Sequence, residues 1–183
     1  MSGPTDTVLE KHVRGNGFDS ITVRNHLPDI KTIDEMVMVG MYARNYNRTP
    51  GYTFKPLAST NAKNLVYEIR KPMPAILKVF IKKDELLMVE SMDISKVADG
   101  KMSCSIRAKD PGNIDIEVDT TYQQARGARK GIDVTTVNTI RFANGQNIPK
   151  VMLKAVELWI RMTTANVRKI DRRVHAELFG AAR

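Results

Sequence analysis

The segment from Pro149 to about Phe179 constrains the fold of this chain most, because it has the pattern of a long amphipathic helix. Proline is favoured in the first helical turn and glycine just past the last one, and Gly180 follows the segment. One narrow stripe of this helix holds mostly apolar side chains. They are Met152, Val156, Trp159, Thr163, Val167, Ile170 and Val174. Burying six apolar side chains contributes about 10 kcal/mol or more, so the stripe must lie against an apolar surface.

Apolar and polar residues alternate in several earlier segments, as they do in strands with one buried face. "MSCSIR" and "NIDIEVD" alternate clearly, and "AKDPGN" between them is typical of a turn. We expect a hairpin with Met102, Cys104 and Ile106 on one strand and Ile114, Ile116 and Val118 on the other. "FDSITVR", "NLVYEIR", "AILKVFI" and "IDVTTVNTIRF" also predict strands, whereas "ELLMVES" fits either a strand or a helix.

A second helix is predicted near the N-terminus by the capping-box pattern of Thr32 and Glu35. It runs to about Asn45, and we expect it to turn one face inward. The residues of that face are Ile33, Met36, Val37 and Met41.

These elements predict an α+β fold, in which an antiparallel sheet is packed by an N-terminal helix and a long C-terminal helix. The chain of 183 residues is long enough for one domain with a real core. Residues 1–17 are polar and hold three glycines and a proline, so we expect a flexible polar arm followed by a single domain over residues 18–183. No signal peptide or membrane span is expected from the hydropathy pattern.

Positive charge is concentrated near the C-terminus. The formal net charge is +9, which favours anionic partners. A basic stripe, expected to point outward, lies almost opposite the apolar stripe of the long helix and holds Lys154, Arg161, Arg168 and Arg172. The loop "RGARKG" adds Arg126, Arg129 and Lys130. These seven residues are candidates for binding a membrane surface or phosphates, although an ordinary solvated face explains them too.

The sequence holds no catalytic pattern. His12, His26 and His175 are scattered, and no spacing predicts a metal site, a phosphate loop or a dinucleotide fold. The single cysteine, Cys104, lies on an alternating strand and is expected to be a buried structural thiol, which excludes an intramolecular disulfide and indicates a reducing setting. We therefore expect no enzyme activity, no cofactor and no metal, with an enzyme of unrecognised type as a minor alternative.

The segment "ITVRNHLPDIKTIDEMVMVGMYARNYNRTPGYTFKPLASTN" resembles the N-terminal part of rhabdovirus matrix proteins of the plant-infecting type. The positions that carry the resemblance are Thr22, Val23, Arg24, Met38, Gly40, Met41, Arg48, Pro50, Tyr52 and Phe54. Among the methionines of the first helix, at least one is expected off the buried face, which suits self-association, although core filling is the alternative.

The resemblance implies a viral structural protein that forms homo-oligomers and bridges an anionic membrane to the viral nucleocapsid or RNA. It implies self-association through Met38, Met41, Pro50 and Tyr52, and no small-molecule substrate. It also implies a location at the inner face of the virion envelope and in the host cytoplasm, with the nucleus as a further option. The alternative is a viral RNA-binding protein, either capsid-like or a silencing suppressor, in which the same basic residues hold phosphates.

Overall fold

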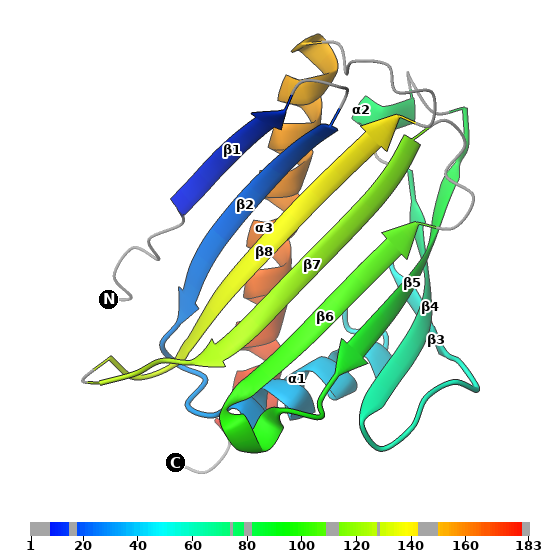
Figure 1. Cartoon of the computed structure of the whole chain (residues 1–183). Helices are drawn as coiled ribbons and strands as arrows, with labels where there is room; N and C mark the ends of the chain where they lie inside the picture. The colour runs from blue at the N-terminus through cyan, green and yellow to red at the C-terminus, as the bar shows by residue number, and fades with distance from the viewer. Residues whose placement is uncertain are drawn as a thin grey trace.

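The computed structural model describes residues 8–14, 18–73, 75–78, 82–108, 114–127, 129–142 and 150–180. Within these ranges, eight strands form one antiparallel sheet in the order β1-β2-β8-β7-β6-β5-β4-β3 (Figure 1). The strands are β1 (Val8–Arg14), β2 (Phe18–Leu27), β3 (Thr53–Pro56), β4 (Asn64–Pro72), β5 (Glu85–Asp93), β6 (Lys101–Ala108), β7 (Ile114–Gln124) and β8 (Ile132–Phe142). Helices are α1 (Ile33–Asn45), α2 (Ala75–Lys78) and α3 (Lys150–Phe179), with a 3₁₀ turn, η1, at Val97–Asp99.

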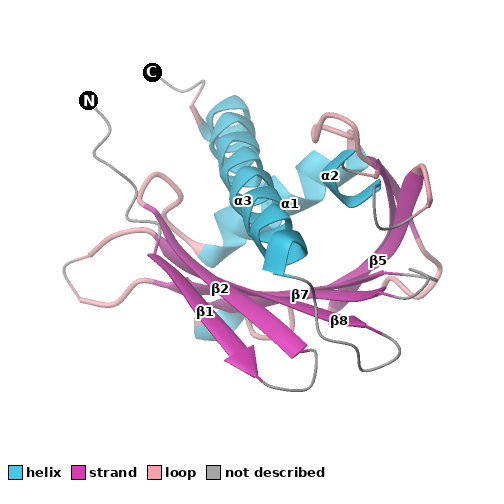
Figure 2. Ribbon diagram, turned by 90° about the horizontal axis from the view of Figure 1, so that it is seen from above, coloured by secondary structure: helices cyan, strands magenta, loops and turns pink. Residues whose placement is uncertain are grey.

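The sheet is strongly curved, and the helices lie on its concave side. Figure 2 shows α3 within the hollow of the sheet, with α1 and α2 beside it. α1 and α3 contact each other, and Glu35 Oε2 of α1 lies 3.2 Å from His175 Nε2 of α3. The expected α+β architecture, an antiparallel sheet packed by an N-terminal and a long C-terminal helix, is confirmed at this level.

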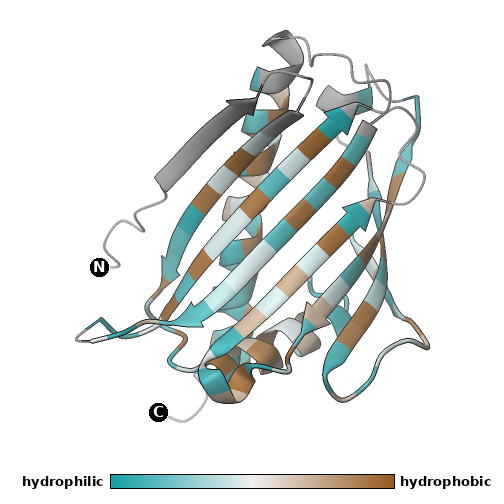
Figure 3. Ribbon diagram, viewed as in Figure 1, coloured by the Kyte–Doolittle hydropathy of each residue, from teal (hydrophilic) through white to brown (hydrophobic). Residues whose placement is uncertain are grey.

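Strand alternation places apolar side chains on the concave face. Figure 3 shows the alternation itself as bands of differing hydropathy along β7 and β8. The buried pairs Ile116–Ile140 and Tyr122–Val134 lie opposite each other on these two strands. Two groups of buried side chains lie between α3 and the sheet. One includes Val156 of α3, and the other includes Val174. Val156, Trp159, Ile170 and Val174 of the apolar stripe therefore pack on the sheet as predicted, whereas the side chain of Met152 lies outside the described residues.

The predicted N-cap of α1 is present, since the Thr32 hydroxyl accepts a hydrogen bond of 3.1 Å from the Glu35 amide. The Glu35 carboxylate reaches back to the amide of Lys31 at 2.7 Å. The inward face of α1 is formed by Ile33, Met36, Val39, Gly40 and Ala43. Val37 and Met41, which were expected on this face, are only half-buried.

Two local predictions were wrong. Residues 75–78 of "AILKVFI" form the short helix α2 instead of a strand, and residues 79–81 lie outside the described part. Residues 8–14, expected to belong to a flexible arm, form β1 because their backbone pairs with β2 from Val8–Arg24 to Arg14–Phe18. "ELLMVES" is a strand, β5. The turn residues 109–113 between β6 and β7 lie outside the described residues.

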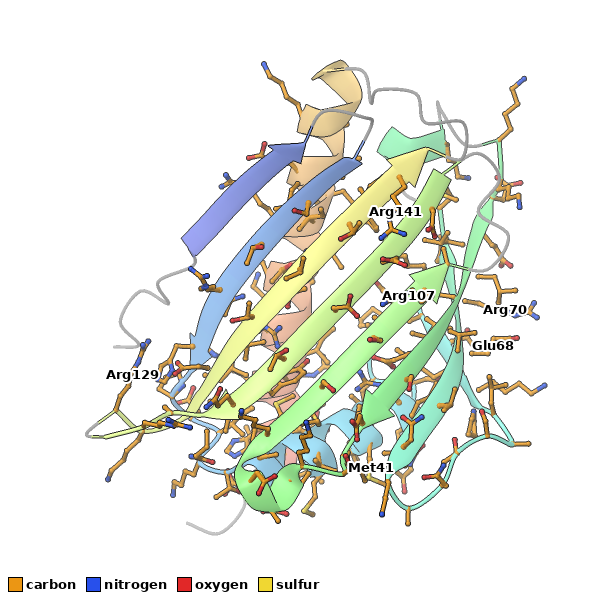
Figure 4. The ribbon with its side chains drawn as sticks, viewed as in Figure 1. Met41, Glu68, Arg70, Arg107, Arg129 and Arg141 are labelled. Carbon is orange, nitrogen blue, oxygen red and sulfur yellow. The ribbon has the colours of Figure 1, made fainter. Side chains whose placement is uncertain are left out.

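The convex face of the sheet is polar and carries ion pairs. Figure 4 shows Arg107 of β6 and Arg141 of β8 on this face, away from α3. Arg107 contacts Asp119 at 3.0 Å, and Arg141 contacts Glu117 at 3.1 Å. The two faces of the sheet thus differ in character, and the concave face is the one that forms an interior.

Candidate functional site

A cavity of about 150 Å³ lies between the concave face of the sheet, α1 and α3. Most of its wall is apolar and rich in methionine and aromatic side chains. The larger apolar and aromatic lining residues are Met36, Tyr52, Phe54, Ile69, Met88, Met92, Met102, Ile106, Ile116, Tyr122, Trp159, Ile160 and Ile170. Such a wall suits an apolar molecule, because methionine adapts its shape and makes favourable sulfur–aromatic contacts.

Polar side chains interrupt the apolar pattern on the concave face where the cavity lies. They are Lys71 on β4, Glu90 on β5, Cys104 on β6, Thr120 on β7, and Thr136 and Asn138 on β8. The hydroxyls of Thr120 and Thr136 are 3.1 Å apart, and the Asn138 amide donates a hydrogen bond of 3.3 Å to the Ile21 carbonyl. A few polar groups in an apolar wall are typical of small-molecule sites.

Arg44 of α1 and Glu90 of β5 form a buried ion pair at one wall of the cavity. Burial raises the pKa of the Glu90 carboxyl, but the charge and hydrogen bonds of Arg44 outweigh it, so this pKa lies below its ordinary value of 4.5. The thiol of Cys104 also contacts Glu90 Oε1 at 2.8 Å. Burial and the Glu90 charge raise the pKa of Cys104 well above its ordinary value, which keeps it a thiol.

A second ion pair joins Arg168 and Asp171 within α3. Arg168 Nη1 donates a hydrogen bond of 2.8 Å to Asp171, and its guanidinium lies 5.7 Å from the centre of the Tyr122 ring. Burial raises the pKa of Asp171 above its ordinary value, and the attraction of Arg168 only partly opposes this. Both residues face the sheet and line the cavity.

Lys71 of β4 is the fifth charged residue of the cavity wall. It is only 7% exposed, and its ammonium lies 4.4 Å from the centre of the Trp159 ring and 5.3 Å from that of Tyr52. Its Nζ also donates a hydrogen bond of 3.4 Å to the Tyr52 hydroxyl. Burial lowers the pKa of Lys71 from 10.5 to about 8.

The four residues of the predicted basic stripe of α3 differ in their exposure to solvent. Lys154 and Arg161 are exposed, as expected, with Arg161 paired to Glu157 at 2.9 Å. The prediction was wrong for Arg168, which is buried in the cavity wall because the helix turns it toward Tyr122. Arg172 is half-buried, its Nε lacks a hydrogen-bond partner, and that atom lies 3.8 Å from Asp29. These residues therefore do not form one continuous outward surface.

The basic loop residues Arg126, Arg129 and Lys130 are exposed between β7 and β8. Arg129, labelled in Figure 4, lies 3.7 Å from Asp133. Whether this loop binds an anion stays a prediction.

The residues assigned to self-association lie in different environments. Met38 and Pro50 are exposed, Met41 is half-buried, and Tyr52 lines the cavity. Tyr52 therefore has a place in the interior rather than on an open contact surface.

Arg44, Lys71 and Glu90 were missed as site residues by the sequence reasoning. The sequence did carry a signal for Lys71 and Glu90, because each lies in a strand whose other inward-facing residues are apolar. Cys104 was correctly expected to be buried. Within the described residues, no cluster of His, Cys, Asp or Glu side chains could hold a metal ion. The same residues include no helix with the length and apolarity needed to cross a membrane.

No protein-family model matches the sequence, and a sequence search of curated proteins finds no match. Solved structures match over most of the chain. The crystal structure of human STARD10 has a TM-score of 0.59 at 10% identity and covers 91% of this chain and 73% of that chain. The Zhui aromatase/cyclase from Streptomyces sp. R1128 has a TM-score of 0.58 at 8% identity, covering 90% and 98%. Human StAR-related lipid transfer protein 5 has a TM-score of 0.52 at 12% identity, covering 91% and 88%.

The chain therefore has a START/Bet v1-like fold, and the resemblance to rhabdovirus matrix proteins was wrong. The functions inferred from that resemblance were therefore wrong as well. They were a bridge between an anionic membrane and a viral nucleocapsid, with the nucleocapsid as partner, and the RNA-binding alternative. The expectation of no small-molecule ligand is also corrected, because the matching fold recurs in a lipid transfer protein and this chain contains a largely apolar cavity.

Proposed function

We propose that this chain binds a hydrophobic small molecule or lipid in the cavity beneath α3. The observation that carries the proposal is the apolar cavity itself, which lies between α1, α3 and the concave face of the sheet. Folded proteins fill their interiors closely and leave few voids larger than a water molecule. A cavity of about 150 Å³ with a largely apolar wall is thus more easily explained by a ligand than by packing.

The size of the cavity favours a small ligand. An apolar cavity of about 150 Å³ is large enough for a benzene ring. We therefore propose a compact ligand, close in size to a substituted benzene ring, rather than a two-chain lipid. One of the matching structures is that of a lipid transfer protein, which supports an apolar ligand in general.

We further propose that the chain is a binding protein and not an enzyme. One matching structure is an aromatase/cyclase. In this chain, however, Glu90 and Asp171 are each neutralised by an arginine, and the Cys104 thiol is held protonated. Paired carboxylates and an inert thiol are poorly suited to acid–base or nucleophilic chemistry.

A cavity-filling substitution tests this function. Thr163 of α3 lines the cavity, whereas its neighbour Met162 is exposed to solvent and does not line it. Calorimetric titration with the neutral probe 3-phenyl-1-propanol should show binding to the wild type and to Met162→Trp, and a loss of more than about tenfold in affinity for Thr163→Trp. Equal affinity of the two variants, both folded by circular dichroism, would place the binding site elsewhere.

A further inference from the structure

The charges in the wall of the cavity do not balance. Three positive side chains, Arg44, Lys71 and Arg168, and two negative ones, Glu90 and Asp171, line it, which leaves one positive charge (3 − 2 = 1). Glu90 is paired with Arg44 at 2.5 Å and Asp171 with Arg168 at 2.8 Å. The excess charge therefore belongs to Lys71.

Lys71 has aromatic neighbours but no counter-ion among the residues that the structure describes. It contacts the Trp159 ring, the Tyr52 ring and the Tyr52 hydroxyl. Aromatic faces partly stabilise an ammonium group. They do not replace a carboxylate, since the pKa of Lys71 still falls to about 8 through burial. The ammonium nevertheless remains mostly protonated at neutral pH.

We propose that the ligand of this cavity is a compact apolar monocarboxylate, whose carboxylate pairs with the ammonium of Lys71. This inference rests on the proposed function and names the chemical class of the ligand. A carboxylate brings one negative charge and matches the single excess charge of the wall. A phosphate monoester brings a charge of about −1.5 to −2 and would leave a buried negative excess.

The rest of the wall indicates the apolar part of this ligand. Met36, Met92 and Met102 line the cavity together with Phe54 and Trp159. Methionine sulfur packs favourably against aromatic rings. An aromatic ring carried on a short chain from the carboxylate suits both the volume and the lining.

The experiment compares two probes of equal shape, 3-phenylpropionate and 3-phenyl-1-propanol, by calorimetric titration at pH 7. The wild type should bind the acid at least about tenfold more tightly than the alcohol, because a charged hydrogen-bonded pair replaces a neutral contact. Lys71→Met should lose this preference and still bind the alcohol. Lys101→Met, which removes an exposed lysine on β6, should behave as the wild type.

Each outcome separates this inference from the function on which it rests. A wild type that binds both probes equally overturns the role of Lys71 while leaving the cavity function standing. Retention of the acid preference by Lys71→Met also overturns it. Alcohol binding by Lys71→Met shows that the variant is folded. If neither probe binds the wild type or Lys101→Met, the proposed function itself fails.

Discussion

Arg44 of α1 and Glu90 of β5, 46 positions apart in sequence, form two hydrogen bonds of 2.5 Å at the wall of the cavity. Arg44 also donates a hydrogen bond of 2.8 Å to the Gly40 carbonyl of its own helix. A β-carbon at Gly40 would lie 3.2 Å from both Arg44 Nη1 and the Met92 methyl group. A side chain at Gly40 would therefore press on the Arg44 guanidinium and on the end of the Met92 side chain.

Arg44→Met should lower the free energy of unfolding by about 3–5 kcal/mol, because it leaves the carboxylate of Glu90 buried without its partner. Adding Glu90→Leu should recover most of the loss. In the single variant, Glu90 can regain stability by taking up a proton, so the loss should be smaller at pH 5 than at pH 8. Urea unfolding measures all three effects, and a double variant less stable than Arg44→Met would contradict the buried pairing.

Arg168 and Arg161 of α3 should differ sharply in their contribution to stability. Arg168→Met leaves Asp171 buried and unpaired, which should cost about 3–5 kcal/mol. Arg161→Met removes only an exposed pair with Glu157, and the change should stay within about 0.5 kcal/mol. Similar losses in the two variants, measured by chemical unfolding, would argue that Arg168 faces solvent as the sequence had suggested.

Lys71 should make stability depend on pH in the alkaline range. Because its pKa falls from 10.5 to about 8 on folding, the unfolded chain binds more protons at this site between these values. The free energy of unfolding therefore gains up to about 3 kcal/mol from this site as pH rises from 8 to 10.5. Lys71→Met abolishes the gain, so its stability relative to the wild type should be greater at pH 7 than at pH 10. A relative stability that is the same at both pH values would show that Lys71 is not buried as a cation.

Gly131, at the end of the basic loop, should tolerate substitution less well than Gly127. Both have positive φ, +111° and +73°, which costs a residue with a side chain about 1–2 kcal/mol. A β-carbon at Gly131 would also lie 2.5 Å from the Leu27 carbonyl oxygen, whereas one at Gly127 meets no atom within 4 Å. We expect Gly131→Ala to be the more destabilising in thermal unfolding. Equal melting temperatures would contradict the close approach of the loop to β2.

Strand alternation and the N-cap at Thr32 allowed most of the architecture to be predicted, because both are local signals. Residues 75–78 were misassigned for the same reason: a short run of apolar residues fits a strand or a helical turn, and only its surroundings decide. Strand β1 was missed because its stability comes from pairing with β2 and not from its own pattern.

The candidate site was harder to predict, because it depends on polar residues that face inward. In β5 the inward positions are Leu86, Met88, Glu90 and Met92, and Glu90 alone breaks the apolar series. The position of Glu90 in this apolar series is visible in the sequence, but its ion-pair partner Arg44 lies in another element, α1. Arg168 was predicted to face solvent because charged residues usually lie on the solvent-exposed side of a helix. In the structure it is buried, where it pairs with Asp171 and contacts the Tyr122 ring.

The methionine methyl groups offer the most direct test of ligand binding in the cavity. Met36, Met88, Met92 and Met102 line it, whereas Met38 and Met162 are exposed on α1 and α3. With methyl-labelled methionine, titration with 3-phenyl-1-propanol should shift the NMR signals of the four cavity residues and leave those of Met38 and Met162 in place. Shifts confined to the two exposed methionines, or no shifts at all, would contradict binding in this cavity.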